Sequence, residues 1–135
     1  MIYYDFNQDE GVLLVLMEGP ITTDDILRNM DFITDTVGIP RNLKLVTDFR
    51  NADFVSPVSD MEIILKYSAE KSKQFIFIKE AFITVTPKNT ALAMIYAKET
   101  NQSSDYKFKV FSTLESALIW MKDLDLVTFR EISFN

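Results

Sequence analysis

Three aspartates near the middle of the chain have the types and spacing of a small chemical site. Asp48 ends an apolar segment that is typical of a strand, and Asp53 and Asp60 follow it. Ligands of open α/β sheets usually bind beyond the carboxyl ends of the strands, and grouped carboxylates can hold Mg²⁺ or act as general acid and base. These residues define one hypothesis, a carboxylate-dependent hydrolase with a metal site. In the competing interpretation they serve only a strand end, a turn and a helix start.

Two serines, Ser56 and Ser59, lie in the segment NADFVSPVSDME between a predicted strand and a predicted helix. Ser59 and Glu62 have the spacing of a capping box, in which each side chain accepts a hydrogen bond from the other residue's backbone N–H. A phosphate at a helix N-terminus would also be electrostatically favourable. We interpret the serines first as helix caps, with a phosphoswitch as the alternative.

The apolar run FIFIKEAFITVT, residues 75–86, contains more large side chains than one strand needs on both faces. We expect the strand itself at 81–86. The large side chains of this run either fill the core or form an apolar ligand pocket or partner-binding patch. The candidates for that patch are Phe75, Phe77, Ile78 and Phe82.

The composition excludes much of the usual catalytic chemistry. The 135 residues include no His and no Cys, so imidazole bases, thiolate nucleophiles and thiolate metal ligands are absent. No glycine-rich phosphate loop or nucleophile-elbow motif occurs. The formal net charge of −6 disfavours nucleic acid as a partner, because such binding depends on neutralising phosphates. We therefore expect a protein that is not an enzyme and needs no cofactor.

The N-terminal segment, MIYYDFNQDEG, has neither the basic region nor the apolar region of a secretory signal. The apolar run that follows, 12–17, is far shorter than the roughly 20 residues that cross a bilayer. We expect a cytoplasmic protein without a transmembrane segment.

Predicted strands and helices alternate along the chain. An N-terminal hairpin of strands 2–6 and 12–17 precedes a helix that Thr22 or Thr23 caps. The order β-β-α-β-α-β-α-β-α predicts an α/β fold with a mostly parallel mixed sheet and right-handed crossovers. The other predicted elements are strands at 43–49, 81–86 and 107–111, helices at 60–73 and 87–100, and a last helix that begins with a capping box at 112–115.

Helical spacing also predicts which side of the helix at 87–100 is buried. Its residues Ala91, Leu92, Ile95 and Tyr96 recur at helical intervals and are expected to face the core.

The course of the chain from Ile2 to about Lys122 resembles the SpoIIAA-like branch of the STAS superfamily, the sulfate transporter and anti-sigma-factor antagonist domains. The strongest local likeness is the stretch ALAMIYAKET…YKFKVFSTLESALIWM. It combines a helix with Ala-x-x-Tyr, a short strand ending in Phe, and a helix with Glu-x-Ala-x-x-Trp. These are packing residues, so the likeness bears on fold more than on activity.

The resemblance implies a mixed sheet with helices largely on one face. It also implies a non-enzymatic role, either binding another protein or holding a small and often lipid-like ligand. Signalling members carry a phosphorylatable serine in a pattern like Asp-Ser-Ser/Thr-Gly after the third strand. Here Ser56 stands near the position of that Asp, Pro57 and Val58 stand where the serines would be, and no glycine follows.

Residues 1–122 are thus predicted to form one STAS-like domain, and 123–135 a C-terminal extension. The extension is rich in apolar residues, and 126–134 are predicted to form an added strand on the same domain or at a dimer interface. Our leading prediction is a regulatory or protein-interaction module, with another protein or a second copy of the chain as partner. The alternative is a carrier or sensor of a lipid-like or other apolar small molecule.

Overall fold

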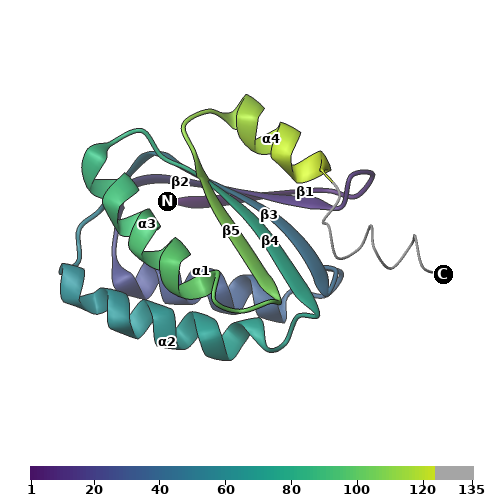
Figure 1. Ribbon diagram of the computed structural model, residues 1–135, viewed down its shortest axis with the longest axis horizontal. Helices are drawn as coiled ribbons and strands as arrows, with labels where there is room; N and C mark the ends of the chain where they lie inside the picture. The colour runs from purple at the N-terminus through teal and green to yellow at the C-terminus, as the bar shows by residue number, and fades with distance from the viewer. Residues whose placement is uncertain (124–135) are drawn as a thin grey trace.

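Residues 1–123, which the computed structural model describes, form a five-stranded sheet with helices on both faces (Figure 1). No helix in this range is long and apolar enough to span a membrane. The elements follow one another in the predicted order. They are β1 (Ile2–Asn7), β2 (Val12–Ile21), α1 (Thr23–Asp35), β3 (Asn42–Phe54), α2 (Met61–Ser72), β4 (Phe77–Ile83), α3 (Pro87–Thr100), β5 (Tyr106–Phe111) and α4 (Leu114–Lys122).

The strands lie side by side in the order β1-β2-β3-β4-β5. β1 and β2 form an antiparallel hairpin, whereas β2, β3, β4 and β5 pair in parallel. Parallel neighbours need a crossover, and α1, α2 and α3 supply the three crossovers. The predicted α/β fold with a mixed sheet and an N-terminal hairpin is therefore confirmed.

Helices α1, α2 and α3 cover one face of the sheet, and α4 lies on the other (Figure 1). Successive residues of a strand point to opposite faces, and β4 divides its side chains accordingly. Ile78 and Phe82 belong to the larger core beneath α1–α3, whereas Ala81 and Ile83 pack against α4. The sheet thus separates two apolar cores.

The position of β4 differs from the prediction of a strand at 81–86. The strand runs from Phe77 to Ile83, since its register with β3 extends from Asn42↔Phe77 to Asp48↔Ile83. Thr86 instead caps α3, whose first turn contains Pro87. The apolar residues after Ile83 suggested a strand because a β-branched run does not reveal where pairing with the neighbours stops.

Two of the predicted helix caps are also wrong. No Ser59 capping box forms, because a 3₁₀ turn at Val58–Asp60 precedes α2 and the N-cap Asp60 makes no side-chain capping hydrogen bond. The last helix is capped one residue later than predicted, by Thr113, which accepts a hydrogen bond from the backbone N–H of Ser116. By contrast, Thr22 caps α1 through a full capping box with Asp25.

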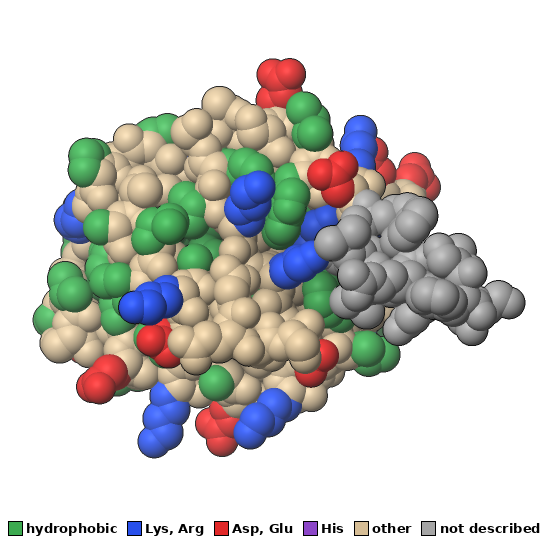
Figure 2. All heavy atoms as spheres, in the orientation of Figure 1, with side chains coloured by type: hydrophobic (Ala, Val, Ile, Leu, Met, Phe, Trp, Pro, Cys, Tyr) green, Lys and Arg blue, Asp and Glu red, His purple; other side chains and the backbone are tan. Residues whose placement is uncertain are grey.

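Helix α3 is rotated relative to its predicted orientation. Leu92 and Tyr96 pack against the core, but Ala91 and Ile95 are exposed. The outward side of α3 carries Met94, 55% exposed, and Ile95, 44% exposed. Figure 2 shows hydrophobic side chains gathered over this part of the molecular face, with Lys, Arg, Asp and Glu intermixed around them.

The predicted strand at 126–134 lies outside the described residues, as does almost all of the extension at 123–135.

Candidate functional site

A cavity of about 140 Å³ lies between the layer of helices α1–α3 and the sheet. Helix α2 packs between α1 and α3, and its inner side faces the sheet across the cavity. The lining is mostly apolar. Representative lining residues are Ile26 and Met30 of α1, Met61 and Ile64 of α2, and Leu45 and Phe82 of the sheet.

Phe82 shows that the cavity reaches the middle of the sheet. It belongs to β4, which has a neighbouring strand on each side and α4 on its opposite face, yet its side chain is only partly buried. Since Phe82 lines the cavity, we attribute its residual exposure to that space. A centrally placed aromatic ring is thus accessible to a small molecule inside the fold.

Aromatic rings continue from Phe82 in an unbroken row along the cavity. Ring centroids lie 5.3 Å apart for Phe49–Phe82, 5.6 Å for Phe82–Phe108, 4.8 Å for Phe108–Tyr96 and 6.4 Å for Tyr96–Tyr106. The rings come from β3, β4, β5 and α3, so the order of the strands brings them together. They form a rigid wall with several π-faces.

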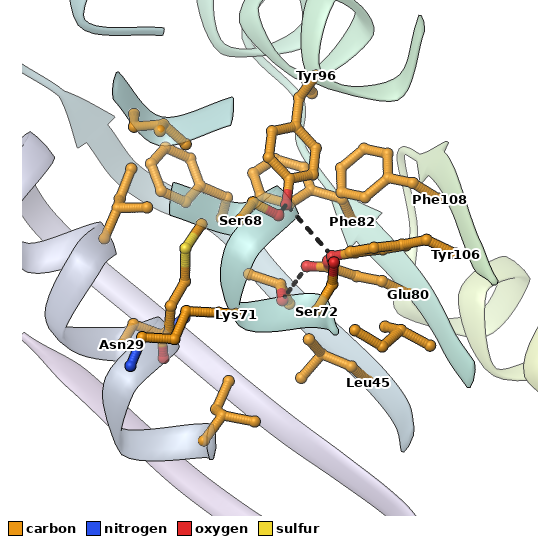
Figure 3. A pocket seen from close by; sticks show the side chains of 18 of the residues that line it. Asn29, Leu45, Ser68, Lys71, Ser72, Glu80, Phe82, Tyr96, Tyr106 and Phe108 are labelled. Carbon is orange, nitrogen blue, oxygen red and sulfur yellow. Dashed lines mark hydrogen bonds between the residues drawn. The ribbon is translucent and has the colours of Figure 1, made fainter. Parts of the chain in front are cut away.

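Glu80 lies among these rings. Its side chain is 7% exposed and lines the cavity from β4. The Thr47 hydroxyl donates a hydrogen bond to Glu80 Oε2 at 2.8 Å, and the Tyr106 hydroxyl donates to Oε1. Figure 3 shows the carboxyl group and the hydroxyl groups of Tyr96 and Tyr106 converging at one place.

The polar cluster continues beyond Glu80 into the helical layer. The hydroxyl oxygens of Tyr106 and Tyr96 are 3.3 Å apart, and the Tyr96 hydroxyl also hydrogen-bonds the hydroxyl of Ser68 on α2. Side chains from β3, β4, β5, α3 and α2 therefore share one chain of hydrogen bonds. Each hydroxyl in it can act as donor or acceptor, so the chain can accommodate a change of charge at Glu80.

Burial governs the electrostatics of this cluster. Desolvation raises the pKa of the Glu80 carboxyl, and the hydrogen bonds from Tyr106 and Thr47 oppose that rise. Burial, and then the nearby Glu80 charge, raise the pKa of Tyr96 to about 12 and that of Tyr106 well above its usual value. Near neutral pH both tyrosines are therefore protonated hydrogen-bond donors.

Among residues 1–123, Lys71 is the one positively charged residue that lines the cavity. Its ammonium group pairs with Asp31 Oδ1 at 2.9 Å, and the Tyr67 hydroxyl donates to the same oxygen. The hydrogen bond from Tyr67 is the main reason that the pKa of Asp31 is lowered. This cation is thus held by α1 and not by Glu80.

Not all of the four candidate apolar residues line the cavity. Phe75, Ile78 and Phe82 line the cavity, and the guanidinium of Arg41 lies 4.8 Å from the Phe75 ring centroid. Phe77 is not among the lining residues, because it precedes Ile78 in β4 and the strand alternation turns it to the other face. Three of the four candidates therefore contact one shared space.

The three candidate aspartates do not come together. Asp48 forms a two-pronged ion pair with Arg50, Asp53 pairs with Lys88 at 2.7 Å, and Asp60 accepts a hydrogen bond from the Thr23 hydroxyl. Residues 1–123 contain no group of three or more His, Cys, Asp or Glu residues that could hold a metal ion. Asp48, Asp53 and Asp60 therefore do not form the shared metal site that the hydrolase hypothesis required.

The two candidate serines have different surroundings. Ser56 is partly buried, and its hydroxyl accepts a hydrogen bond of 2.8 Å from the backbone N–H of Thr23, the first residue of α1. Ser59 is exposed on the 3₁₀ turn. Ser56 thus satisfies one of the free N–H groups of a helix start, but the helix is α1 and not the helix that follows it in the chain.

Glu80 was not among the residues singled out from the sequence. The signal that could have found it is the pair Lys79–Glu80 within the apolar run 75–86. Charged residues are almost never fully buried unless they have partners, so a charged pair inside a buried strand indicates a polar site on each face. An interpretation of the run as uniformly apolar leaves this pair out of account.

No protein-family model matches the chain, and no curated protein matches it. A solved structure does match, that of an uncharacterised protein of the DUF3478 family with a SpoIIAA-like fold from Shewanella loihica PV-4. The TM-score is 0.59 at 20% sequence identity, and the match covers 90% of this chain and 92% of that one. Identity at this level bears on the fold alone. The chain has a SpoIIAA-like fold, as its resemblance to that branch predicted.

Proposed function

We propose that the protein binds a small apolar molecule in the cavity beneath α1–α3, as a carrier or sensor that performs no chemistry on it. The observation that carries this proposal is the cavity itself, about 140 Å³ in volume and lined mostly by apolar side chains. Ligand sites in proteins are typically concave and mostly apolar, with a few convergent polar groups. Glu80, Tyr96 and Tyr106 are such groups.

The volume sets the scale of the ligand. An engineered apolar cavity of roughly 150 Å³ binds benzene, and the cavity here has nearly that volume. A single aromatic ring or a short branched chain therefore fits within this volume, whereas a long acyl chain exceeds it. Among the lipid-like and other apolar ligands expected from the sequence, we favour the small ones.

The methionines allow a direct test. Three of the six line the cavity, namely Met17, Met30 and Met61. Protein labelled with ¹³C at the methionine methyl groups is titrated with toluene and followed by NMR. We expect the three cavity signals to shift and saturate together, because an aromatic ring shifts nuclei that lie close to it.

Two other methionines serve as internal controls. Met94 is on the exposed side of α3, and Met121 packs in the separate core beneath α4. Their signals should stay unchanged at toluene concentrations that saturate the cavity. Equal shifts at all sites would indicate non-specific binding and would reject the proposal, as would the absence of any saturable shift. Native mass spectrometry of freshly purified protein then measures the mass of any ligand that co-purifies.

A second candidate function is protein binding, the role that we first predicted. It is favoured by the outward side of α3, where Met94 and Ile95 are exposed between the charged residues Lys88 and Lys98. Exposed apolar side chains with a polar rim are typical of protein-binding surfaces. We propose a second copy of this chain as the partner, so light scattering should give a mass near twice 15.6 kDa, and Ile95→Glu should return it to the monomer value. A monomeric mass for the unmodified chain would reject this second function.

A further inference from the structure

We propose that the ligand of the cavity carries a protonated amine, which pairs with the carboxylate of Glu80 inside the wall of aromatic rings. This inference rests on the proposed function, since it concerns the same cavity. It specifies the chemical class of the ligand as a small cationic amphiphile, an ammonium group on an apolar body about the size of one ring.

The first argument is the geometry around Glu80. Each carboxylate oxygen accepts one hydrogen bond, from Thr47 at Oε2 and from Tyr106 at Oε1. This arrangement suits an ionised carboxylate, which accepts hydrogen bonds and donates none. Both donors are neutral hydroxyl groups, however, so an ionised Glu80 has hydrogen bonds but no opposite charge among the side chains of residues 1–123. Buried charges in proteins are normally paired.

The second argument is that, within residues 1–123, the lysines nearest to Glu80 in the fold are bound to other groups. Lys71, on α2, lines the same cavity but is bound to Asp31 of α1 at 2.9 Å. Lys79 precedes Glu80 in β4 and points to the opposite face, where its ammonium group donates to the backbone oxygens of Trp120 and Asp123. An ammonium group brought by the ligand would supply the missing charge.

The third argument is the aromatic wall. Cations are attracted to the faces of aromatic rings, and aromatic cages recognise ammonium groups in other proteins. The rings of Phe82, Phe108, Tyr96 and Tyr106 form a connected row whose successive centroids lie 4.8 to 6.4 Å apart. A carboxylate and several ring faces at one place favour an ammonium group over a neutral or anionic group.

The pH dependence of binding follows from the same geometry. Burial disfavours the ionised form of Glu80 in the empty cavity and raises the pKa of this carboxyl, whereas a bound ammonium group favours the ionised form. Binding therefore releases a proton at any pH where Glu80 is protonated in the free protein. The other titratable groups facing this space are Tyr106 on β5, Tyr96 on α3 and Lys71 on α2, and near neutral pH each keeps its proton.

The experiment compares three probes of similar shape and different charge: benzylamine, benzyl alcohol and benzoate. Binding is measured by calorimetry and by the methionine methyl signals. We expect benzylamine to bind at least about tenfold more tightly than benzyl alcohol, as hydrogen bonds to charged groups contribute that much, and benzoate not to bind. Calorimetry in two buffers of different ionisation enthalpy should show proton release, and benzylamine affinity should rise with pH until Glu80 is fully ionised.

The matched variant is Glu80→Gln, which keeps the size of the side chain and one oxygen acceptor but removes the charge. We expect it to abolish the preference for benzylamine while benzyl alcohol still shifts Met17, Met30 and Met61. Equal binding of benzylamine and benzyl alcohol by the unmodified protein would reject the amine as the ligand class but would leave the proposed function standing. Binding of benzoate more tightly than benzylamine would also reject the amine. If no probe binds, the proposed function fails as well. The comparison of the three probes decides the matter even if the variant does not fold.

Discussion

Lys79 and Glu80 are neighbours in β4, yet their side chains lie on opposite faces of the sheet and serve different cores. Lys79 is 4% exposed and Glu80 is 7% exposed. The Lys79 ammonium group donates to the backbone oxygens of Trp120 and Asp123, each at 2.8 Å, at the end of α4. Glu80 faces the cavity on the other side. Lys79 thus holds α4 against the sheet, whereas the Glu80 carboxyl group is accessible to a ligand in the cavity.

Replacing Lys79 with Met should loosen α4 from the sheet. The ammonium group satisfies carbonyl groups at the C-terminal end of the helix and lies 4.7 Å from the centroid of the Trp120 ring. We expect a loss of about 2 kcal/mol in the free energy of unfolding, because charge-assisted hydrogen bonds are lost. Trp120 is the single tryptophan, so its fluorescence should shift to the red.

The control is Lys109→Met on β5, since Lys109 is exposed and its ammonium group lies 5.5 Å from the Phe111 ring centroid. Surface substitutions usually change stability by less than about 0.5 kcal/mol. If Lys79→Met leaves both the stability and the Trp120 emission as they are, Lys79 does not hold α4.

Glu80→Gln should alter how stability depends on pH in the ligand-free protein. Burial raises the Glu80 pKa above its ordinary value of 4.5. The folded state therefore gains stability from protonated Glu80 below about pH 4.5, and this gain is lost as pH rises through the raised pKa. Urea unfolding at several pH values should show the variant becoming progressively more stable relative to the unmodified protein, by up to about 1.4 kcal/mol per pH unit. A difference independent of pH would show that Glu80 ionises as freely in the fold as outside it.

Ser56→Ala should destabilise the protein, and Ser59→Ala should not. The Ser56 hydroxyl accepts the hydrogen bond from the backbone N–H of Thr23, and losing a partner of a helix N-terminus typically costs about 1 kcal/mol. Ser59 is exposed and caps no helix. Denaturant unfolding of both variants measures the difference. If both variants lose the same free energy of unfolding, the hydrogen bond between the Thr23 N–H and the Ser56 hydroxyl makes no specific contribution to stability.

Ala93→Leu should fill the cavity and prevent ligand binding. Ala93 is 5% exposed and lines the cavity from α3, so the larger side chain occupies space that toluene would use. Filling a void restores apolar contacts, and we expect the melting temperature to stay the same or rise. The matched control is Ala91→Leu, on the exposed side of the same helix. Toluene shifts at Met17 that persist in a folded Ala93→Leu variant would place the ligand elsewhere.

The sequence was sufficient to predict the order of the elements and the class of fold, because helical and strand periods and the Thr22 and Pro87 start signals are local. Strand ends were less predictable. The end of β4 depends on hydrogen bonds with β3 and β5, which the residues after Ile83 do not reveal. Of the residues that stood out through their apolar excess, Phe75, Ile78 and Phe82 line the cavity.

The polar part of the site could not be predicted in the same way. Glu80, Tyr106 and Tyr96 come from three elements, and their contact depends on the parallel register of β4 with β5 and on the rotation of α3. The partner of Ser56 lies 33 residues away in sequence. Such long-range contacts produce no periodic pattern in the sequence. Local patterns therefore drew attention to the two serines but could not predict the hydrogen-bond partner of Ser56.

The cavity also gives the folded state a larger total volume than the unfolded state. Any part of this space of about 140 Å³ that water does not fill is eliminated when the chain unfolds, so the total volume of protein and water decreases. Hydrostatic pressure favours the state of smaller volume. Compression should therefore destabilise the folded state of the empty protein, and an occupant that fills the space beneath α1–α3 should oppose this effect.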